Sequence, residues 1–289
     1  MPLTSTADIV GAARAIGTGV GAFNVIQLET AEAIVAGAEQ VDLPVLLQIS
    51  ENCVRYHGSL APIAAATVAV ATASGVPVGA HLDHATSPDL VREACDLGFT
   101  SVMFDAAHLD YADNVRLTRE VAVTCHDRGL WVEAELGAIG GKDGAHAPGV
   151  RTDPDEAREF VAATGVDGLA VAVGSSHAMT QRDATLDLEL IGRLRAAVPV
   201  PLVLHGSSGV ASQDLARAVD AGMTKVNVST HLNKVFTTAV RGYLDAHPTV
   251  VDTRKYVAVG RAAMAAEVAE LLEVVSRGRA QAAPAARRQ

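Results

Sequence analysis

Short apolar runs alternate along the chain with longer segments whose apolar residues recur at helical spacing. The runs are almost continuously apolar, which is typical of parallel strands buried on both faces. Eight strands are predicted, at residues 20–25, 45–50, 76–83, 101–106, 131–137, 168–174, 201–206 and 225–230.

Three of the intervening segments have clear helix signals, with a Ser or Asp N-cap at the start and a glycine at the end. They are predicted to begin at Ser87, Asp153 and Ser212 and to end at Gly98, near Gly165 and at Gly222. Eight strand-then-helix units predict an α/β protein with a (β/α)₈ TIM barrel. An open doubly wound sheet is the alternative, but it would usually have fewer strands and often a Gly-rich nucleotide turn.

The chain has 289 residues, of which 49% are hydrophobic, and contains no linker-like polar stretch. One domain, residues 1–275, is therefore expected, with a disordered Ala- and Arg-rich tail at residues 276–289. The longest apolar stretch, near residues 61–73, is interrupted by polar residues and is shorter than the roughly 18 to 20 residues of a membrane span. No membrane span is predicted.

The net charge of −10 argues against a nucleic-acid or anionic-membrane surface but permits a local basic pocket. The first residues lack the features of a secretory signal, so a cytoplasmic location is expected. Cys53, Cys95 and Cys125 show no CxxC spacing, which predicts reduced thiols and neither disulfides nor a thiolate zinc site.

Chemistry in such a barrel is expected at the carboxyl ends of the strands. His84, His177 and His205 follow three of them, and three imidazoles with an open position form a common catalytic zinc site. A single histidine there would more often be an ordinary loop residue, but three together favour Zn²⁺. The other polar strand-end residues are Asn24, Gln48, Ser50, Asp83, Asp105, Glu133, Glu135, Ser175, Ser176, Ser207, Asn227, Ser229 and Thr230.

Asp83 precedes His84 and is placed to transfer a proton close to the metal, or else to orient a neighbouring imidazole. His81 lies deeper on the same strand face and is expected to belong to a buried polar network. Residues 205–209 and 227–230 end strands seven and eight, where barrels frequently bind phosphate, although a Gly/Ser turn can also be only a turn.

Five stretches, at residues 21–25, 81–84, 132–141, 204–209 and 225–228, resemble class II fructose-bisphosphate and tagatose-bisphosphate aldolases, and the likeness runs from about Leu3 to about Leu272. The resemblance implies that His84, His177 and His205 hold one zinc ion. It also implies that the metal polarises a ketose carbonyl and stabilises the enediolate left when the C3–C4 bond breaks. Dihydroxyacetone phosphate and an aldehyde would be released, in carbohydrate metabolism and glycolysis.

The same resemblance implies that Asp83 is the acid–base residue for the C4 hydroxyl, and that Asp105 and Glu135 hold a second or displaced metal ion. No Schiff-base lysine is needed, and Lys225 is expected to begin its strand and point elsewhere. A homodimer or homotetramer is implied. Substrate and phosphate contacts are expected from Asn24, Ser50, Gly206, Ser207, Ser208, Asn227, Val228, Ser229, Thr230 and, for the far phosphate, Arg254.

The chain departs from the family pattern at two places. Ala178 follows His177 where a glycine is usual, which would crowd a phosphate or a monovalent cation, and Arg182 would restore positive charge. The loop after strand five lacks the usual glutamates, so Asp143 is the residue expected to take over their proton-transfer role.

Two other functions use the same histidines. One is a barrel zinc hydrolase that activates water, which the phosphate turns argue against. The other is a catalytically silent sugar-phosphate-binding relative, which the intact histidines and Asp83 argue against.

Overall fold

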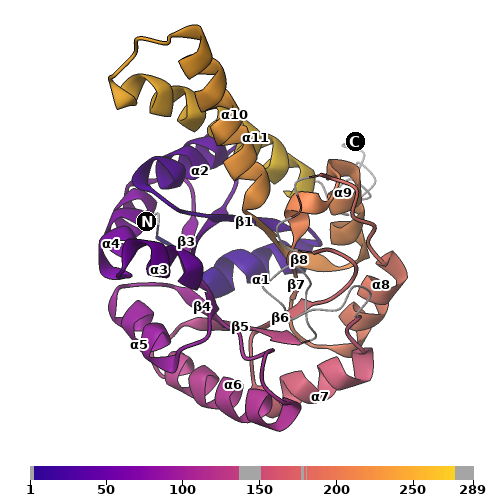
Figure 1. Cartoon of the computed structure of the whole chain (residues 1–289). Coiled ribbons are helices and arrows are strands. Elements are labelled where there is room, and N and C mark those ends of the chain that lie inside the picture. The colour runs from indigo at the N-terminus through magenta and orange to yellow at the C-terminus, as the bar shows by residue number, and fades with distance from the viewer. Residues whose placement is uncertain (1–2, 137–150, 177–178, 180, 277–289) are drawn as a thin grey trace, which may run out of the picture.

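The structure, a computed structural model, describes residues 3–136, 151–176, 179 and 181–276. Eight parallel strands pair in sequence order and close into a barrel, with β8 beside β1 (Figure 1). The strands are β1 (Val20–Asn24), β2 (Val45–Ser50), β3 (Val78–Ala85), β4 (Ser101–Phe104), β5 (Trp131–Leu136), β6 (Gly168–Val171), β7 (Leu202–Leu204) and β8 (Met223–Val228).

Helices surround the barrel and connect its strands (Figure 1). They are α1 (Thr6–Ile16), α2 (Leu28–Val41), α3 (Glu51–His57), α4 (Ala61–Ala73), α5 (Pro88–Asp96), α6 (Tyr111–His126), α7 (Pro154–Thr164), α8 (Leu188–Ala197), α9 (Ser212–Ala221), α10 (Thr230–Ala246) and α11 (Thr253–Ser276). A short 3₁₀ turn, η1 (Ser207–Gly209), follows β7.

Two of the three predicted N-caps act as expected, whereas Ser212 is the first residue of α9 and the N-cap position before it is Ala211, with no side-chain capping bond. The side chain of Ser87 accepts the backbone N–H of Leu90 at the start of α5, and Asp153 accepts two backbone N–H groups at the start of α7. Gly165 ends α7 with φ +73°, a conformation that an L-residue rarely adopts. Local sequence chemistry therefore sets where these helices begin and end.

Helix α1 covers one end of the barrel, through both polar and apolar contacts. At the amino ends of the strands, Thr4 N–H donates to Val78 O, and Thr6 Oγ1 lies 2.7 Å from Ser101 Oγ, so α1 closes this end. An apolar cluster that includes Leu46 and Trp131 packs against α1. Buried polar side chains lie further along the strands and mark the end where chemistry is expected.

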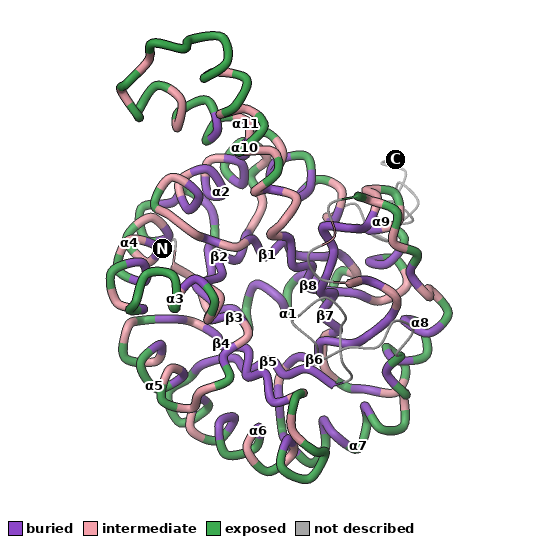
Figure 2. The backbone as a smooth tube through the Cα atoms, viewed as in Figure 1, coloured by how far each residue is buried: buried purple, intermediate pink, exposed green. Residues whose placement is uncertain are grey.

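Helices α10 and α11 extend beyond the rest of the molecule as a projection (Figure 1), and most of it is exposed or half-buried (Figure 2). The later part of α11 packs against α2 and β1. None of the helices in the described part of the chain is long and apolar enough to cross a membrane.

The predicted (β/α)₈ barrel is confirmed. Strand ends differ by a few residues: β3 continues to Ala85, and β8 begins at Met223. Lys225 is therefore the third residue of its strand, and the prediction that it begins the strand and points elsewhere is wrong, because its fully buried side chain enters the barrel. Helix α11 includes Ser276, whereas the rest of the predicted tail lies outside the described residues.

Candidate active site

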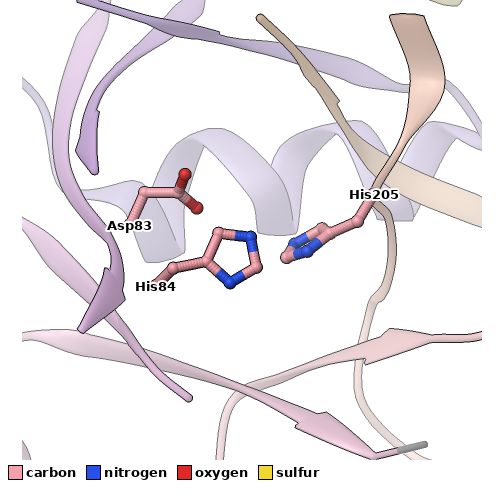
Figure 3. A group of neighbouring side chains, drawn as sticks. All are labelled: Asp83, His84 and His205. Carbon is pink, nitrogen blue, oxygen red and sulfur yellow. The ribbon is translucent and has the colours of Figure 1, made fainter. Parts of the chain in front are cut away.

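A bulge at the end of β3 places two successive side chains at the barrel mouth. The pairing of β3 with β4 shifts register between Leu82 and Ala85, and His84 has φ +51°. In a regular strand Asp83 and His84 would point to opposite faces, but a bulge redirects one of them. Figure 3 shows both side chains directed toward His205, which follows β7.

These residues form two groups of possible metal ligands. Asp83, His84 and His205 each offer one ligand atom, and the three atoms lie within 4.8 Å of one another. His84, Asp105 and Glu135 form a second group of the same kind. The His84 and His205 rings lie edge to face with centroids 4.8 Å apart. Imidazole nitrogens with nearby carboxylates are a donor set that suits zinc.

Glu133 orients His205 from inside the barrel. His205 Nε2 lies 2.9 Å from Glu133 Oε1, and both side chains are fully buried. His205 Nδ1 lies 3.4 Å from Glu135 Oε2. Burial alone would lower the pKa of His205, but its bonds to Glu133 and Glu135 outweigh burial and raise the pKa to about 9. Glu133 therefore holds Nε2, as a carboxylate commonly holds the non-ligating nitrogen of a metal-bound histidine, and Nδ1 is the candidate ligand atom.

A buried charge network continues beneath His205. Lys225 Nζ lies 2.8 Å from Glu133 Oε2. His81 Nδ1 lies 2.8 Å from Ser101 Oγ, and its Nε2 lies 3.9 Å from Glu133. Burial, together with Lys225, lowers the pKa of His81 to about 3. Against the effect of burial, Lys225 and His205 hold the pKa of Glu133 well below its usual range. His81 thus belongs to a buried polar network, as its strand position predicts.

Asp83 is buried but ionised. Asn24 Nδ2 donates to its Oδ2 at 3.3 Å, and Gln48 Nε2 in turn donates to Asn24 Oδ1 at 2.8 Å. Burial would raise the pKa of Asp83, but His84, His205 and other nearby cationic groups lower it to about 2. Asp83 Oδ1 is buried and has no hydrogen-bond partner among the described residues. A carboxylate of this kind can accept a proton from a substrate hydroxyl.

The turn after β7 meets the start of α10. Gly206 has φ +67°, and a Cβ there would lie 2.6 Å from the carbonyl oxygen of Ser176. Ser208 Oγ accepts the backbone N–H of Ser229 at 3.3 Å and that of His231 at 3.1 Å. The first turn of α10 contains no acidic residue. Backbone N–H groups at a helix start, with no acidic residue in the first turn itself, favour an anion such as phosphate.

The remaining predicted substrate residues have other contacts. Ser50 caps α3 by accepting the N–H of Cys53 at 3.2 Å. Arg182 Nε donates to Val210 O at 2.8 Å, and its Nη2 donates to Ser212 Oγ at 3.1 Å. Lys225 Nζ donates to Asn227 Oδ1 at 2.8 Å, below the mouth.

Arg254 lies on the projection. It is the second residue of α11, its side chain is 89% exposed, and it pairs with Asp252. Figure 1 shows that the connection between α10 and α11 lies at the outer end of the projection, so the structure does not bring Arg254 to the mouth of its own barrel. Asp143, His177 and Ala178 lie outside the described residues.

Known proteins are similar to this chain in sequence and fold. The sequence profile of the family described as fructose-bisphosphate aldolase class-II matches residues 4–279. The chain belongs to this family. As a class II aldolase it is a carbon–carbon lyase.

Individual members of the family match nearly end to end. The fructose-bisphosphate aldolase of Geobacillus stearothermophilus is 39% identical over 285 residues, which cover 97% of this chain and 99% of that protein. The crystal structure of the YdjI aldolase from Escherichia coli K12 superimposes with a TM-score of 0.84 at 32% identity, covering 96% of this chain and 99% of the other.

A fructose-bisphosphate aldolase from Campylobacter jejuni aligns with a TM-score of 0.79 at 22% identity, over 96% of this chain and 97% of the other, which shows the shared fold alone. All eight strands of the barrel lie within the residues that match the class II aldolase family.

Three residues that support this site have no role predicted from the sequence. Glu133 was one of many strand-end residues, and its contacts with His205 and Lys225 join three strands. His231 and Glu267 pair at 2.7 Å across α10 and α11. The one available signal was that His231 directly follows the turn at residues 227–230.

Proposed function

We propose that this class II aldolase reversibly cleaves fructose-1,6-bisphosphate, or a related ketose bisphosphate, to dihydroxyacetone phosphate and an aldehyde. The observation that carries the proposal is the cluster of Asp83, His84 and His205, in which a buried, ionised carboxylate lies against two possible zinc ligands (Figure 3). The cluster is next to a turn that suits phosphate.

His84 and His205 would hold the zinc ion, with His177 as the third ligand. Ser175 Oγ donates to the carbonyl oxygen of His205 at 2.6 Å, so the chain just before His177 is fixed to the end of β7. Bound there, zinc supplies Lewis-acid stabilisation of the negative charge that develops when a C–C bond breaks. Asp105 and Glu135 are proposed as ligands of a second or displaced ion.

Asp83 is proposed to accept the proton of the substrate's C4 hydroxyl during cleavage and to return it during condensation. Its pKa of about 2 keeps it ionised at neutral pH. Asn24 would hold one carboxylate oxygen and leave the other for the substrate. Asp143 is proposed for the proton transfer at the other reacting carbon.

The phosphate of dihydroxyacetone phosphate is proposed to bind between the β7 turn and the start of α10. Ser50, Ala178 and Arg182 are proposed to lie further around the mouth, with a monovalent cation near Ala178. The proposed contacts at the phosphate are Gly206, Ser207, Ser208, Asn227, Val228, Ser229 and Thr230.

Arg254 is proposed to contact the far phosphate. Because the projection carries Arg254 away from its own barrel mouth, this contact requires a second subunit, in keeping with a proposed homodimer or homotetramer. A cytoplasmic location and a role in glycolysis complete the proposal.

The test is exchange of a C1 hydrogen of dihydroxyacetone phosphate for deuterium, followed by proton NMR with and without chelator. It needs no knowledge of the aldehyde. We expect exchange with zinc and its loss with chelator or in His205→Ala, while His126→Ala, a change on the exposed face of α6, retains it. Absence of exchange at full zinc occupancy would refute the proposal and favour a hydrolase or a silent relative.

A further inference from the structure

Helix α10 begins with the amide groups proposed to hold the substrate's phosphate, yet the hydrophobic core hardly anchors it. Leu232 is the one buried residue among its 17, and Figure 2 shows most of its length as exposed or half-buried. Its N-cap residue, Ser229, makes no side-chain capping bond. The position of its first turn therefore depends on this one apolar anchor together with polar contacts to neighbouring segments.

Helix α11 is anchored where α10 is not. Its later part packs against α2 and β1, and Glu267 lies next to buried Val268. A side chain held this way is a fixed point against which α10 can be positioned. The buried residues of α11 are Gly260, Met264, Ala265, Val268, Ala269, Leu271, Leu272 and Val275.

His231 joins α10 to both of its neighbours. Its backbone N–H donates to Ser208 Oγ at 3.1 Å, which ties the helix start to the turn after β7. Its ring Nε2 lies 2.7 Å from Glu267 Oε1, which ties it to α11. Both side chains of the pair are largely buried, with 16% and 22% exposed, so solvent weakens the bond less than on an open surface.

The surrounding charge supports an ionised Glu267. The hydrogen bond from His231 lowers the pKa of Glu267, against the effect of burial, and Arg182 adds to the lowering. Arg182 also holds the turn after β7 through Val210 O and Ser212 Oγ. The same carboxylate is therefore close to the His231 imidazole and the Arg182 guanidinium, which belong to two segments that border the proposed phosphate site.

We propose that His231 and Glu267 form a clamp that positions the first turn of α10 and thereby sets the affinity of the site for the substrate's phosphate. Both are positioning residues, since the groups proposed to touch phosphate belong to residues 206–208 and 227–230. The inference rests on the proposed function for the identity of the substrate. It predicts weaker phosphate binding when the clamp is opened.

The effect should be confined to binding. The clamp residues are absent from both groups of possible metal ligands among the described residues, and their hydrogen bonds lead to Ser208 and to each other. Opening the clamp should therefore raise KM for a phosphorylated substrate and leave kcat nearly unchanged. If the pair only stabilised the fold, opening it would lower stability without raising KM at constant kcat.

The experiment compares zinc-loaded wild type with Glu267→Ala, Glu267→Gln and Arg261→Ala. Arg261 lies elsewhere on α11, pairs with Glu32 of α2 and serves as the control. Two quantities are measured: KM and kcat for fructose-1,6-bisphosphate, and the Kd of inorganic phosphate by calorimetry. Loss of a hydrogen bond to a charged group should raise KM and Kd about tenfold in Glu267→Ala, with kcat within about twofold. Gln keeps an acceptor oxygen and should restore most of the affinity.

The clamp is overturned if Glu267→Ala matches Arg261→Ala in phosphate Kd, if kcat falls while KM and Kd stay constant, or if Gln fails to rescue. Should Glu267→Ala not fold, His231→Asn carries the same comparison, because it removes the ring but keeps the backbone N–H on Ser208. Failure of wild type to cleave the bisphosphate would count against the proposed function, whereas the phosphate Kd would still decide the clamp.

Discussion

His205 Nε2 and Glu133 Oε1 lie 2.9 Å apart inside the barrel, where neither side chain has any contact with solvent. The opposite oxygen of Glu133 lies 2.8 Å from Lys225 Nζ. A carboxylate that is held by a lysine and in turn holds a metal-ligating imidazole fixes which ring nitrogen faces the metal. This relationship joins β5, β7 and β8 and explains why a charged triad lies in the barrel interior.

Glu133→Gln should weaken zinc binding by about 10- to 100-fold, because the imidazole loses its carboxylate partner. Competition with a chromophoric chelator measures the change, and Glu120→Gln on the exposed face of α6 is the control.

Glu133→Gln also leaves Lys225 buried without its counter-charge, which should destabilise the fold. The double variant Glu133→Gln/Lys225→Met should recover stability but not zinc affinity. Recovery of both would show that Glu133 acts on folding alone.

Asp83→Ala should lower the rate of carbon–carbon cleavage by at least about 100-fold, because an acid–base group that transfers the proton is removed. Zinc content should stay at wild-type level, since the histidines hold the ion. His205→Ala should lose both cleavage and zinc. Metal analysis measures the zinc content, and a coupled assay on the same preparations measures the cleavage rate. Full activity in Asp83→Ala would overturn the assignment of Asp83 as the acid–base residue.

The fold could be predicted from the sequence because its signals are local. The eight apolar runs, and caps such as Ser87 and Asp153, act within a few residues and fix the elements almost in place. The residues at the carboxyl ends of the strands followed from the barrel topology, so the grouping of Asp83, His84 and His205 was predictable.

The supporting contacts could not be predicted because they are long-range. The bulge that gives His84 a φ of +51° arises from the pairing of β3 with β4. Lys225 was expected to begin its strand and point elsewhere, but β8 begins two residues earlier, so the side chain lies deeper along the strand, where it meets Glu133 of another strand. The His231–Glu267 pair joins residues 36 positions apart on two helices.

Gly206→Ala should disrupt the proposed phosphate turn more than an ordinary glycine substitution. Gly206 and Gly165 have similar positive φ angles, +67° and +73°, but a Cβ at Gly206 would lie 2.6 Å from Ser176 O, whereas Gly165 faces open space. The backbone strain alone costs about 1 to 2 kcal/mol. Overpacking adds about 1 to 3 kcal/mol at Gly206.

Thermal unfolding of both variants separates the two costs. Gly206→Ala should show the larger drop in Tm and a raised KM, and Gly165→Ala should keep the wild-type KM. Equal Tm values in the two variants would mean that the Ser176 backbone moves away freely.

Cys95 should react with alkylating reagents at neutral pH, unlike the other two thiols. The hydrogen bond from the Cys125 thiol, with help from the charge of Arg128, lowers the pKa of Cys95 to about 7, against the effect of burial. Burial raises the pKa of Cys53. Because the thiolate is the nucleophile, alkylation of Cys95 should rise as pH increases from about 6 to about 8 and then level off.

Mass spectrometry of iodoacetamide-treated protein measures the alkylation of each cysteine separately. We expect Cys95→Ser to lack the thiol that is alkylated fastest at neutral pH. Arg128→Ala takes away a neighbouring positive charge and should shift the midpoint of the rate profile to higher pH. A rate at Cys95 that is still climbing above about pH 9 would identify an ordinary thiol with the usual pKa near 8.5. The contact with Cys125 would then not stabilise the Cys95 thiolate.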